Sequence, residues 1–409
     1  MDKNYNKKKP RNQEAATKVA KHLSPSGYER FRDCASWIEF YADREIKKTK
    51  VSRANFCKNR FCPMCAWRQA KKDALKISTL MKYVEQEHKK AFIFVTFTAP
   101  NVKAGDLKAE ITRYNKAFYK MIERKIFRKV NKGYIRKLEI TYNKEPIITH
   151  EMWHGSKRHK PMAEYFKSKG LKIGDSNPNY DTYHTHFHVV FAVNPSYFSD
   201  RTYIKQETWL SEWRDVMGDP NITQVDVRRV KRGKEGKEIN ELAKYAAKDS
   251  DYTQSQEVFD VFYLALKGRQ VTTFNGLFKD AVKLYKAGEL DKYKPIDDTE
   301  YVWYLLYNWG LGEYVEKERR KLTEEERREI NKALPNEAET AEKAGTNTNA
   351  YIKTAIENTT GANFGGGKSR NKPTSIAENA RLMKIPLPLP IKKAIDVLNE
   401  KGGERLPDP

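Results

Sequence analysis

Alternation of histidine with other residues marks residues 183–193, YHTHFHVVFAV, as the most distinctive stretch of the chain. Successive side chains of a β-strand point to opposite faces, so His184, His186 and His188 would share one face. The Val- and Phe-rich end of the stretch also favours a strand. We therefore predict a β-strand that carries three imidazoles on one side.

The hydrophobic pattern predicts further elements before this strand. Residues 91–100 form an aromatic and β-branched run that ends in proline, and a run that is apolar on both faces is typical of a central strand. Residues 107–130 carry apolar positions at helical spacing. Residues 133–143 alternate as a second strand, on which Glu139 has the same parity as Lys137.

Polar segments and shorter elements surround the histidine strand. Residues 144–181 are too long and too polar for a hairpin turn, and we expect a mobile excursion there. Beyond the histidines, the pattern predicts a helix at residues 205–217 and a strand at residues 224–230. A basic turn at residues 231–237 then leads into another helix at residues 238–248.

The helix predicted at residues 238–248 has a chemically mixed face. At 100° per residue, Glu241, Tyr245, Lys248 and Tyr252 fall in one narrow stripe if the helix continues that far. One helix face would thus offer a carboxylate, a phenol and an ammonium group together.

These patterns divide the chain into five parts within an α+β fold. We expect a flexible basic arm (1–27), a basic cysteine module (28–90), a sheet domain (91–285, with the insert 144–181), a helical C-terminal region (286–334) and a mostly disordered tail (335–409). Within the helical C-terminal region, residues 317–333 are predicted to form a charged helix.

Charge indicates the kind of partner. The chain has 78 Lys and Arg against 54 Asp and Glu, a net charge of +24 at pH 7, which favours a polyanion such as nucleic acid. No run approaches the ~18 apolar residues of a membrane span, and the basic amino terminus lacks the apolar core of a signal peptide. We expect a cytoplasmic protein without membrane contact, whose cysteines are thiols or thiolates.

All four cysteines lie in the basic module. Two of them form a Cys-x-x-Cys pair, and a complete tetrahedral thiolate set would consist of Cys34, Cys57, Cys62 and Cys65. Zinc is the expected ion, and it would stabilise a small module that grips phosphates. A redox pair and inert buried thiols are the alternatives.

Three imidazoles on one strand face form a candidate metal site, with a phosphate-binding row or a solvated polar edge strand as alternatives. Together with the basic charge and a tyrosine on a separate helix, the site suggests phosphodiester chemistry. A divalent ion would act as a Lewis acid while the oxygen of Tyr245 attacks phosphorus. Because a free phenol has a pKa of ~10, Lys248 or the ion would have to favour the phenolate. Alternatively, Tyr245 is a half-buried structural aromatic residue.

Several motifs carry a family resemblance. In chain order they are RFCPMCAWR (60–68), FVTFT (94–98), LEITYN (138–143), HFH (186–188), ELAKY (241–245) and KDSDY (248–252). They resemble the motifs of plasmid rolling-circle replication initiators, which belong to the HUH endonuclease superfamily. The resemblance covers roughly residues 28–285.

The resemblance implies a ferredoxin-like nicking domain with a central antiparallel sheet. Such a domain would bind plasmid origin DNA, with the nick site single-stranded or in a hairpin, and cut one strand. Tyr245 would be joined to the 5′ phosphate, leaving a 3′ hydroxyl to prime synthesis. His186 and His188 would hold Mg²⁺ or Mn²⁺, with Glu139 or His184 as the third ligand.

Two further residues receive roles from the resemblance. Glu241 matches a glutamate that activates water at termination in some relatives, and Tyr252 is the rival nucleophile to Tyr245. The resemblance also implies a host helicase and a polymerase as partners. The alternatives are a relaxase or transposase with the same chemistry, and a non-catalytic zinc-dependent DNA-binding regulator.

Overall fold

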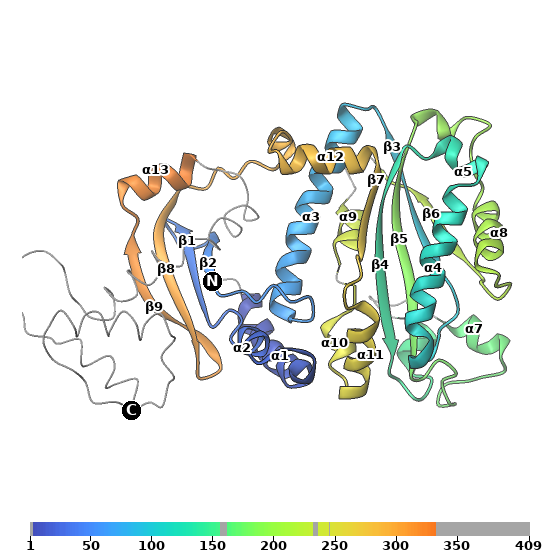
Figure 1. Ribbon diagram of the computed structural model, residues 1–409, viewed down its shortest axis with the longest axis horizontal. Helices are drawn as coiled ribbons and strands as arrows, with labels where there is room; N and C mark the ends of the chain where they lie inside the picture. Colours follow the sequence, from blue (N-terminus) through green and yellow to red (C-terminus); the bar gives the residue numbers. More distant parts are fainter. Residues whose placement is uncertain (1–2, 156–161, 232–235, 245, 333–409) are drawn as a thin grey trace, which may run out of the picture. The chain divides into compact units, whose positions relative to one another are not determined.

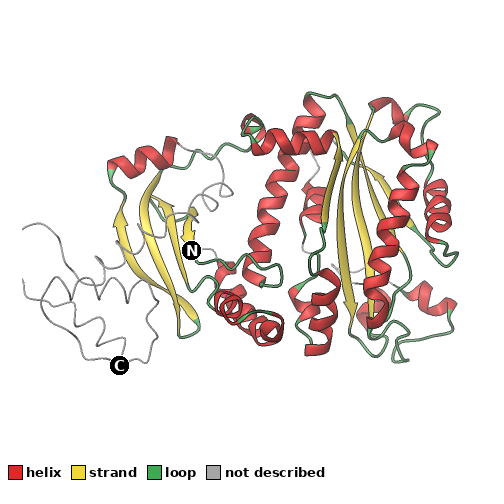
Figure 2. Ribbon diagram, in the orientation of Figure 1, coloured by secondary structure: helices red, strands yellow, loops and turns green. Residues whose placement is uncertain are grey.

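The computed structural model describes residues 3–155, 162–231, 236–244 and 246–332 (Figure 1). The expected tail at residues 335–409 lies outside this part of the chain. Helices combine with two antiparallel sheets, which confirms the predicted α+β class (Figure 2). None of the helices in the described ranges is both long enough and apolar enough to cross a membrane.

The histidine strand lies in the middle of a five-stranded sheet. The strand order is β6-β3-β5-β4-β7, and every neighbouring pair is antiparallel. The strands are β3 (Ala91–Thr98), β4 (Gly133–Asn143), β5 (Thr182–Val193), β6 (Val225–Arg229) and β7 (Thr272–Gly276). Four of the five were predicted, whereas β7 is short and polar and gave no clear strand pattern.

The edge pair β4 and β7 requires glycine where the two strands meet. Gly276 has a φ of +52°, and an added Cβ would lie 2.5 Å from the Lys132 carbonyl oxygen and 2.7 Å from the Gly133 Cα. Only glycine fits such a conformation and such a close approach without strain. These glycines therefore allow β7 to join the sheet.

One face of the five-stranded sheet is covered by α4 (Leu107–Ile122) and α8 (Gln206–Met217) (Figure 1). The Phe97 ring of β3 packs 5.9 Å from Phe118 of α4 and 4.8 Å from Trp213 of α8, measured between ring centroids. These aromatic contacts confirm that β3 is buried on this face as well as on the other.

The opposite face is covered by α3 (Pro63–Gln86), α9 (Gly236–Ala243) and α12 (Leu277–Lys286). Their apolar side chains form a core with Phe94 and Val190 of the sheet. The His188 ring stacks on Phe94 with centroids 5.8 Å apart, so the histidines lie on this second face.

The helix predicted at residues 107–130 is interrupted. The structure has α4 and then α5 (Lys125–Val130), with Arg124 between them in an extended conformation (ψ 142°). The Arg124 side chain pairs with Glu212 and Asp215 of α8. This tertiary contact accompanies a break that helical spacing alone did not reveal.

The prediction of a helical C-terminal region is wrong, because most of this region belongs to a second sheet of four antiparallel strands. Its order is β2 (Thr49–Ala54), β1 (Trp37–Asp43), β8 (Tyr301–Gly310) and β9 (Glu313–Lys321). Burial along β9 alternates, which is the period of a strand. Only α13 (Glu324–Lys332) keeps part of the predicted helix. The sheet therefore joins the cysteine module at residues 28–90 to residues 286–334.

The expected flexible arm at residues 1–27 is instead largely helical. It contains α1 (Lys3–Val19) and the start of α2 (Pro25–Arg32). Tyr5, Ala15 and Val19 of α1 are buried in the main core. The lysine-rich composition therefore concealed an apolar stripe that the rest of the chain covers.

The insert at residues 144–181 also departs from the expected mobile excursion where it is described. It contains α6 (His150–His154) and α7 (Ala163–Ser168), and Ile148 and Phe166 are buried. An isolated bridge joins Ile147 to Ser176. The remaining helices are α10 (Asp249–Tyr252), α11 (Gln256–Leu266), η1 (Ala20–His22), η2 (Ala104–Asp106), η3 (Pro195–Phe198) and η4 (Asp291–Tyr293).

Candidate active site

Two neighbouring strands bring an imidazole and a carboxylate together. Glu139 of β4 lies opposite His186 of β5, and its carboxylate is hydrogen-bonded to the His188 Nε2 at 2.8 Å. The other ring nitrogen of His188, Nδ1, lies 3.2 Å from the Thr96 hydroxyl of β3. The ring is therefore oriented from both sides, with Glu139 and His188 both nearly buried.

A second carboxylate reaches this pair from α9. One ligand atom each from Glu139, His188 and Glu241 lies within 4.8 Å of the others. Two carboxylates and one imidazole suit a hard divalent cation such as Mg²⁺ or Mn²⁺. The chemistry of this donor set therefore fits the ion expected from the sequence, with Glu241 in the position of a third ligand.

The other two histidines lie beside this group but do not belong to it. The His184 and His186 ring centroids are 4.0 Å apart, and those of His186 and His188 are 5.9 Å apart. Burial lowers the pKa of His184 to about 4 and that of His186 well below its ordinary value. Both rings are thus neutral near pH 7, the form in which histidine binds metals.

His186 has an unused polar atom at this site. Its Nδ1 is buried and makes no hydrogen bond to any residue the structure describes. A buried imidazole nitrogen without a partner is costly, so its lone pair or proton is available to a ligand. The predicted ligands thus lie on one face, although only Glu139 and His188 lie in the compact group.

Positive charge surrounds the carboxylates. The Lys244 ammonium lies 2.6 Å from the Glu241 carboxylate. Burial tends to raise the pKa of Glu139, but the bond to His188 and the charges of Lys244 and Lys248 outweigh it and hold that pKa below its ordinary value. Lys244 was not predicted, because on an ideal helix it lies off the stripe that contains Glu241.

The helix face predicted to unite Glu241, Tyr245, Lys248 and Tyr252 is not formed. The helix α9 ends at Ala243, and α10 begins at Asp249. Between them the Ala246 carbonyl accepts a hydrogen bond from the Ile140 N–H of β4 at 2.8 Å. The chain beyond α9 thus bonds to β4 and does not continue the helix.

Tyr245 itself lies outside the described residues, but the residues on either side of it are placed. Lys244 pairs with Glu241, and Ala246 bonds to Ile140, the residue after Glu139. Lys248 is exposed, and its charge acts on Glu139 and His186. The residues on either side of the predicted nucleophile therefore contact Glu241 and the strand that carries Glu139.

Tyr252 lies elsewhere in the fold. It is only 2% exposed, and its hydroxyl donates a hydrogen bond to the Phe61 carbonyl oxygen at 3.1 Å. Its ring packs edge-on against Phe61 and Phe259. These contacts give Tyr252 a packing role beside the cysteines and do not support it as an alternative nucleophile.

The four cysteines form a compact cluster, as the sequence predicted. All four Sγ atoms lie within 4.8 Å of one another, with Cys34 3.5 Å from Cys65 and 3.5 Å from Cys62, and Cys57 3.6 Å from Cys65. The Lys58 N–H points at the Cys65 sulfur at 3.2 Å. Hydrogen bonds from the other thiols lower the pKa of Cys65, whereas burial raises that of Cys62.

The geometry of the cluster fits a tetrahedral metal ion. Four sulfurs from one loop, one helix start and a preceding turn can surround a single Zn²⁺. Two residues of α1 that sequence reasoning missed contact the cluster: the Asn12 amide donates to the Cys62 sulfur at 3.3 Å, and the Lys9 ammonium to the Cys34 carbonyl at 2.7 Å. No motif marks such contacts, because they depend on how α1 packs.

The chain is similar to known replication proteins. A family model described as "Replication protein" matches residues 48–315. The chain is 45% identical over 249 residues to a "Protein rep" of Staphylococcus aureus, which covers 61% of this chain and 93% of that protein. It is also 32% identical over 286 residues to a "Protein rep" of Bacillus amyloliquefaciens, and the alignment covers 64% of this chain and 74% of the Bacillus protein. No solved structure gives a significant match.

Proposed function

This chain belongs to the replication protein family of plasmid rolling-circle replication initiators, and we propose that it acts by nicking one strand of origin DNA through Tyr245. The observation that carries the proposal is the group formed by Glu139, His188 and Glu241. The residues on either side of position 245 bond to members of this group or to the residue next to them. We further propose that the five-stranded sheet and its helices form the ferredoxin-like HUH nicking domain.

In the nicking step, the phenolic oxygen of Tyr245 forms a bond to the phosphorus of the scissile phosphate. The bond from phosphorus to the 3′ oxygen breaks, and that oxygen takes up a proton to leave a 3′ hydroxyl primer. One phosphodiester is exchanged for another, which conserves the energy of the bond. The charges of Lys244 and Lys248 favour the phenolate and the negative phosphate.

The metal-binding residues in this proposal are Glu139, His188 and Glu241, with His186 and His184 beside them. A bound Mg²⁺ or Mn²⁺ would polarise the scissile phosphate as a Lewis acid. The residues themselves orient the site: Thr96 and Glu139 fix the His188 ring. His186 offers its unpaired Nδ1.

Glu241 receives a second role at termination. As a carboxylate it can accept a proton from water. The water oxygen then bonds to phosphorus as the bond from that phosphorus to the 3′ oxygen breaks, and the 3′ oxygen takes up a proton. The DNA is thereby released without a new phosphotyrosine, so a second round is prevented. Glu241 also forms an ion pair with Lys244 at 2.6 Å, and this contact would have to loosen when Glu241 accepts the proton.

The remaining parts serve DNA binding in this proposal. Zn²⁺ held by the four cysteines would stabilise the end of the fold that contains α1, and the net charge of +24 would attract origin DNA. A host helicase and a polymerase would follow at the nick. The protein would act in the cytoplasm, where plasmid DNA is copied.

The test is a nicking assay on supercoiled plasmid that carries the cognate origin, with Mn²⁺ present. The wild-type protein should give open circles with protein attached to the 5′ end, and mass spectrometry should find the DNA on the Tyr245 peptide. Tyr245→Phe should give no covalent product. Undiminished covalent product from Tyr245→Phe would refute the proposed nucleophile.

A further inference from the structure

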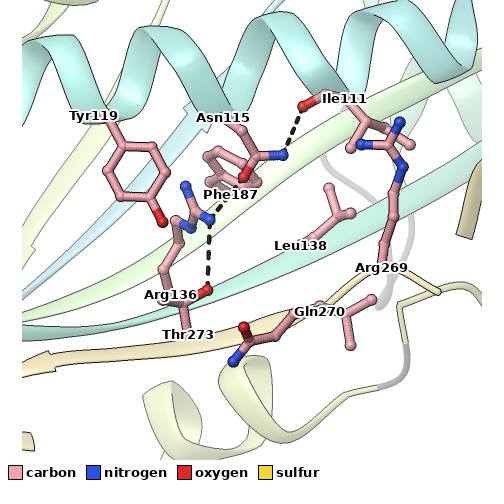
Figure 3. A pocket seen from close by; sticks show the side chains of 10 residues that line it. Ile111, Asn115, Tyr119, Arg136, Leu138, Phe187, Arg269, Gln270 and Thr273 are labelled. Carbon is pink, nitrogen blue, oxygen red and sulfur yellow. Dashed lines mark hydrogen bonds between the residues drawn. The ribbon is translucent and has the colours of Figure 1, made fainter. Parts of the chain in front are cut away.

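A pocket lies on the sheet face opposite the histidines (Figure 3). It has a volume of about 230 Å³, and it lies between α4, the strands β4 and β7, and the segment that precedes β7. Its walls are formed by Ile111, Asn115, Tyr119, Arg136, Leu138, Phe187, Arg269, Gln270, Val271 and Thr273. Two of these ten residues are arginines and none is acidic, so the pocket is positively charged.

Arg136 supplies a buried cation to this pocket. It is only 4% exposed, and its Nη2 donates to the Asn115 side-chain oxygen at 2.7 Å and to the Thr273 hydroxyl at 3.5 Å. Its guanidinium also lies over the aromatic rings of Phe187 (4.3 Å to the centroid) and Phe118 (4.8 Å). All of these partners are electrically neutral.

The second terminal nitrogen of Arg136 is unsatisfied. Its Nη1 is buried and makes no hydrogen bond within the described part of the chain. The polar groups around the guanidinium there are neutral, the Tyr119 hydroxyl among them, and none is a carboxylate. A buried guanidinium is strongly destabilising unless an anion pairs with it, and arginine is almost never so buried without one. Burial also lowers the pKa of Arg136, although the group stays charged.

Arg269 adds a second guanidinium from the other side. Figure 3 shows the guanidinium groups of Arg136 and Arg269 at opposite ends of the pocket, with Leu138 between them. Arg269 is held there by bonds from its Nη2 to the Lys108 carbonyl and the Thr112 hydroxyl of α4, both at 3.1 Å. Tyr119 is 48% exposed, so the pocket is reached from solvent beside its ring.

We propose that this pocket binds a phosphate group through Arg136, with Arg269 as a second positive group. A planar guanidinium with a free N–H is suited to the oxygens of phosphate. A volume of about 230 Å³ is below the ~300–1,000 Å³ of pockets for drug-sized ligands, so the part of the ligand that enters the pocket is no larger than a mononucleotide. The sheet separates the pocket from Glu139 and His188, so the proposal is independent of the nicking chemistry.

Phosphate could come from a free ion, a nucleotide or the end of a DNA strand, and titration calorimetry with three probes distinguishes these sources. The probes are inorganic phosphate, thymidine monophosphate and a short 5′-phosphorylated oligonucleotide, each added to the full-length protein. Arg136→Gln should weaken binding of the preferred probe at least tenfold, and Arg269→Gln severalfold. The matched control is Lys116→Gln, which removes one charge from an exposed position of α4 outside this pocket and should leave binding unchanged.

The outcome depends on the difference between variants, because other parts of this basic protein also attract anions. The proposal is overturned if no probe binds, or if Arg136→Gln and Lys116→Gln bind every probe equally. If Arg136→Gln loses binding of the oligonucleotide alone, the source of the phosphate is a DNA end. If it loses binding of either small probe, the source is a free ligand. If Arg136→Gln does not fold, as judged by circular dichroism, the Arg269→Gln variant decides by the same comparison.

Discussion

Replacing Tyr252 with phenylalanine distinguishes packing from catalysis at the rival tyrosine. The change removes one hydroxyl oxygen and leaves the ring against Phe61 and Phe259. The hydroxyl is buried and donates to the Phe61 carbonyl, which lies in the cysteine loop. We expect Tyr252→Phe to be less stable than the wild type and to retain full covalent joining to DNA.

The expected loss follows from this hydrogen bond. A typical bond contributes about 1 kcal/mol net, and a buried carbonyl left without its donor costs about 1–3 kcal/mol. Because the ring contacts are kept, we expect the free energy of unfolding to fall by about 1–2 kcal/mol. A suitable control is Tyr263→Phe, which removes a similar bond, from the Tyr263 hydroxyl to the His22 carbonyl at 3.2 Å.

The assay combines urea unfolding, followed by far-UV circular dichroism, with the covalent nicking assay. Both variants should show lower urea midpoints and the same yield of protein–DNA adduct as the wild type. Loss of the adduct in Tyr252→Phe, at a stability equal to that of Tyr263→Phe, would show that Tyr252 reacts with DNA. An unchanged midpoint for Tyr252→Phe would show that the bond to Phe61 does not contribute to stability.

Three further predictions concern the cysteine cluster, a buried ion pair and the sheet edge. Cys62→Ser should lower the zinc content of the purified protein, measured by atomic absorption, and undiminished zinc would exclude a four-thiolate site. Burial tends to raise the pKa of Asp249, but Lys8 and Arg11 outweigh it and keep that pKa below its ordinary value. The stability that Asp249 contributes should therefore be present above about pH 4 and be lost as the pH falls through the lowered pKa. In urea titrations, the difference in stability between the wild type and Asp249→Asn should shrink over that fall in pH. A difference that does not depend on pH would contradict the role of the ion pair. Gly276→Ala should destabilise the fold by about 1–3 kcal/mol because of its positive φ and the close Lys132 carbonyl. The control is Gly288→Ala, where nothing lies within 4 Å of the added Cβ. An equal loss of stability in the two variants would contradict the role of close approach.

The strands were predictable because their signal is local. In β3 and β5, β-branched and aromatic residues recur over eight or more positions, which few helices tolerate. The family resemblance named Glu139 as a possible ligand, and the register of β4 and β5 brings it to His188. Glu139 and His188 therefore share one face of the sheet because side-chain direction alternates along each strand.

The misjudged elements depend on contacts between distant parts of the chain. The helix α1 is rich in lysine, and only its packing against the cysteine cluster and the core shows which residues are buried. The strand β9 is highly charged, and its pairing with β8 decides its conformation. After α9, the chain bonds to β4 through Ala246, a contact that sequence spacing does not reveal. The local helix and strand propensities did not predict these three features, because tertiary contacts override such propensities.

The pairing of β1 with β8 has a consequence for synthesis of the protein. The ribosome makes β8 about 260 residues after β1, a delay of roughly 13–50 s at bacterial elongation rates. During that interval β1 has only β2 beside it, so one edge of the nascent sheet is open to wrong partners. A chain that is released early would keep this open edge, where strands of other chains can pair.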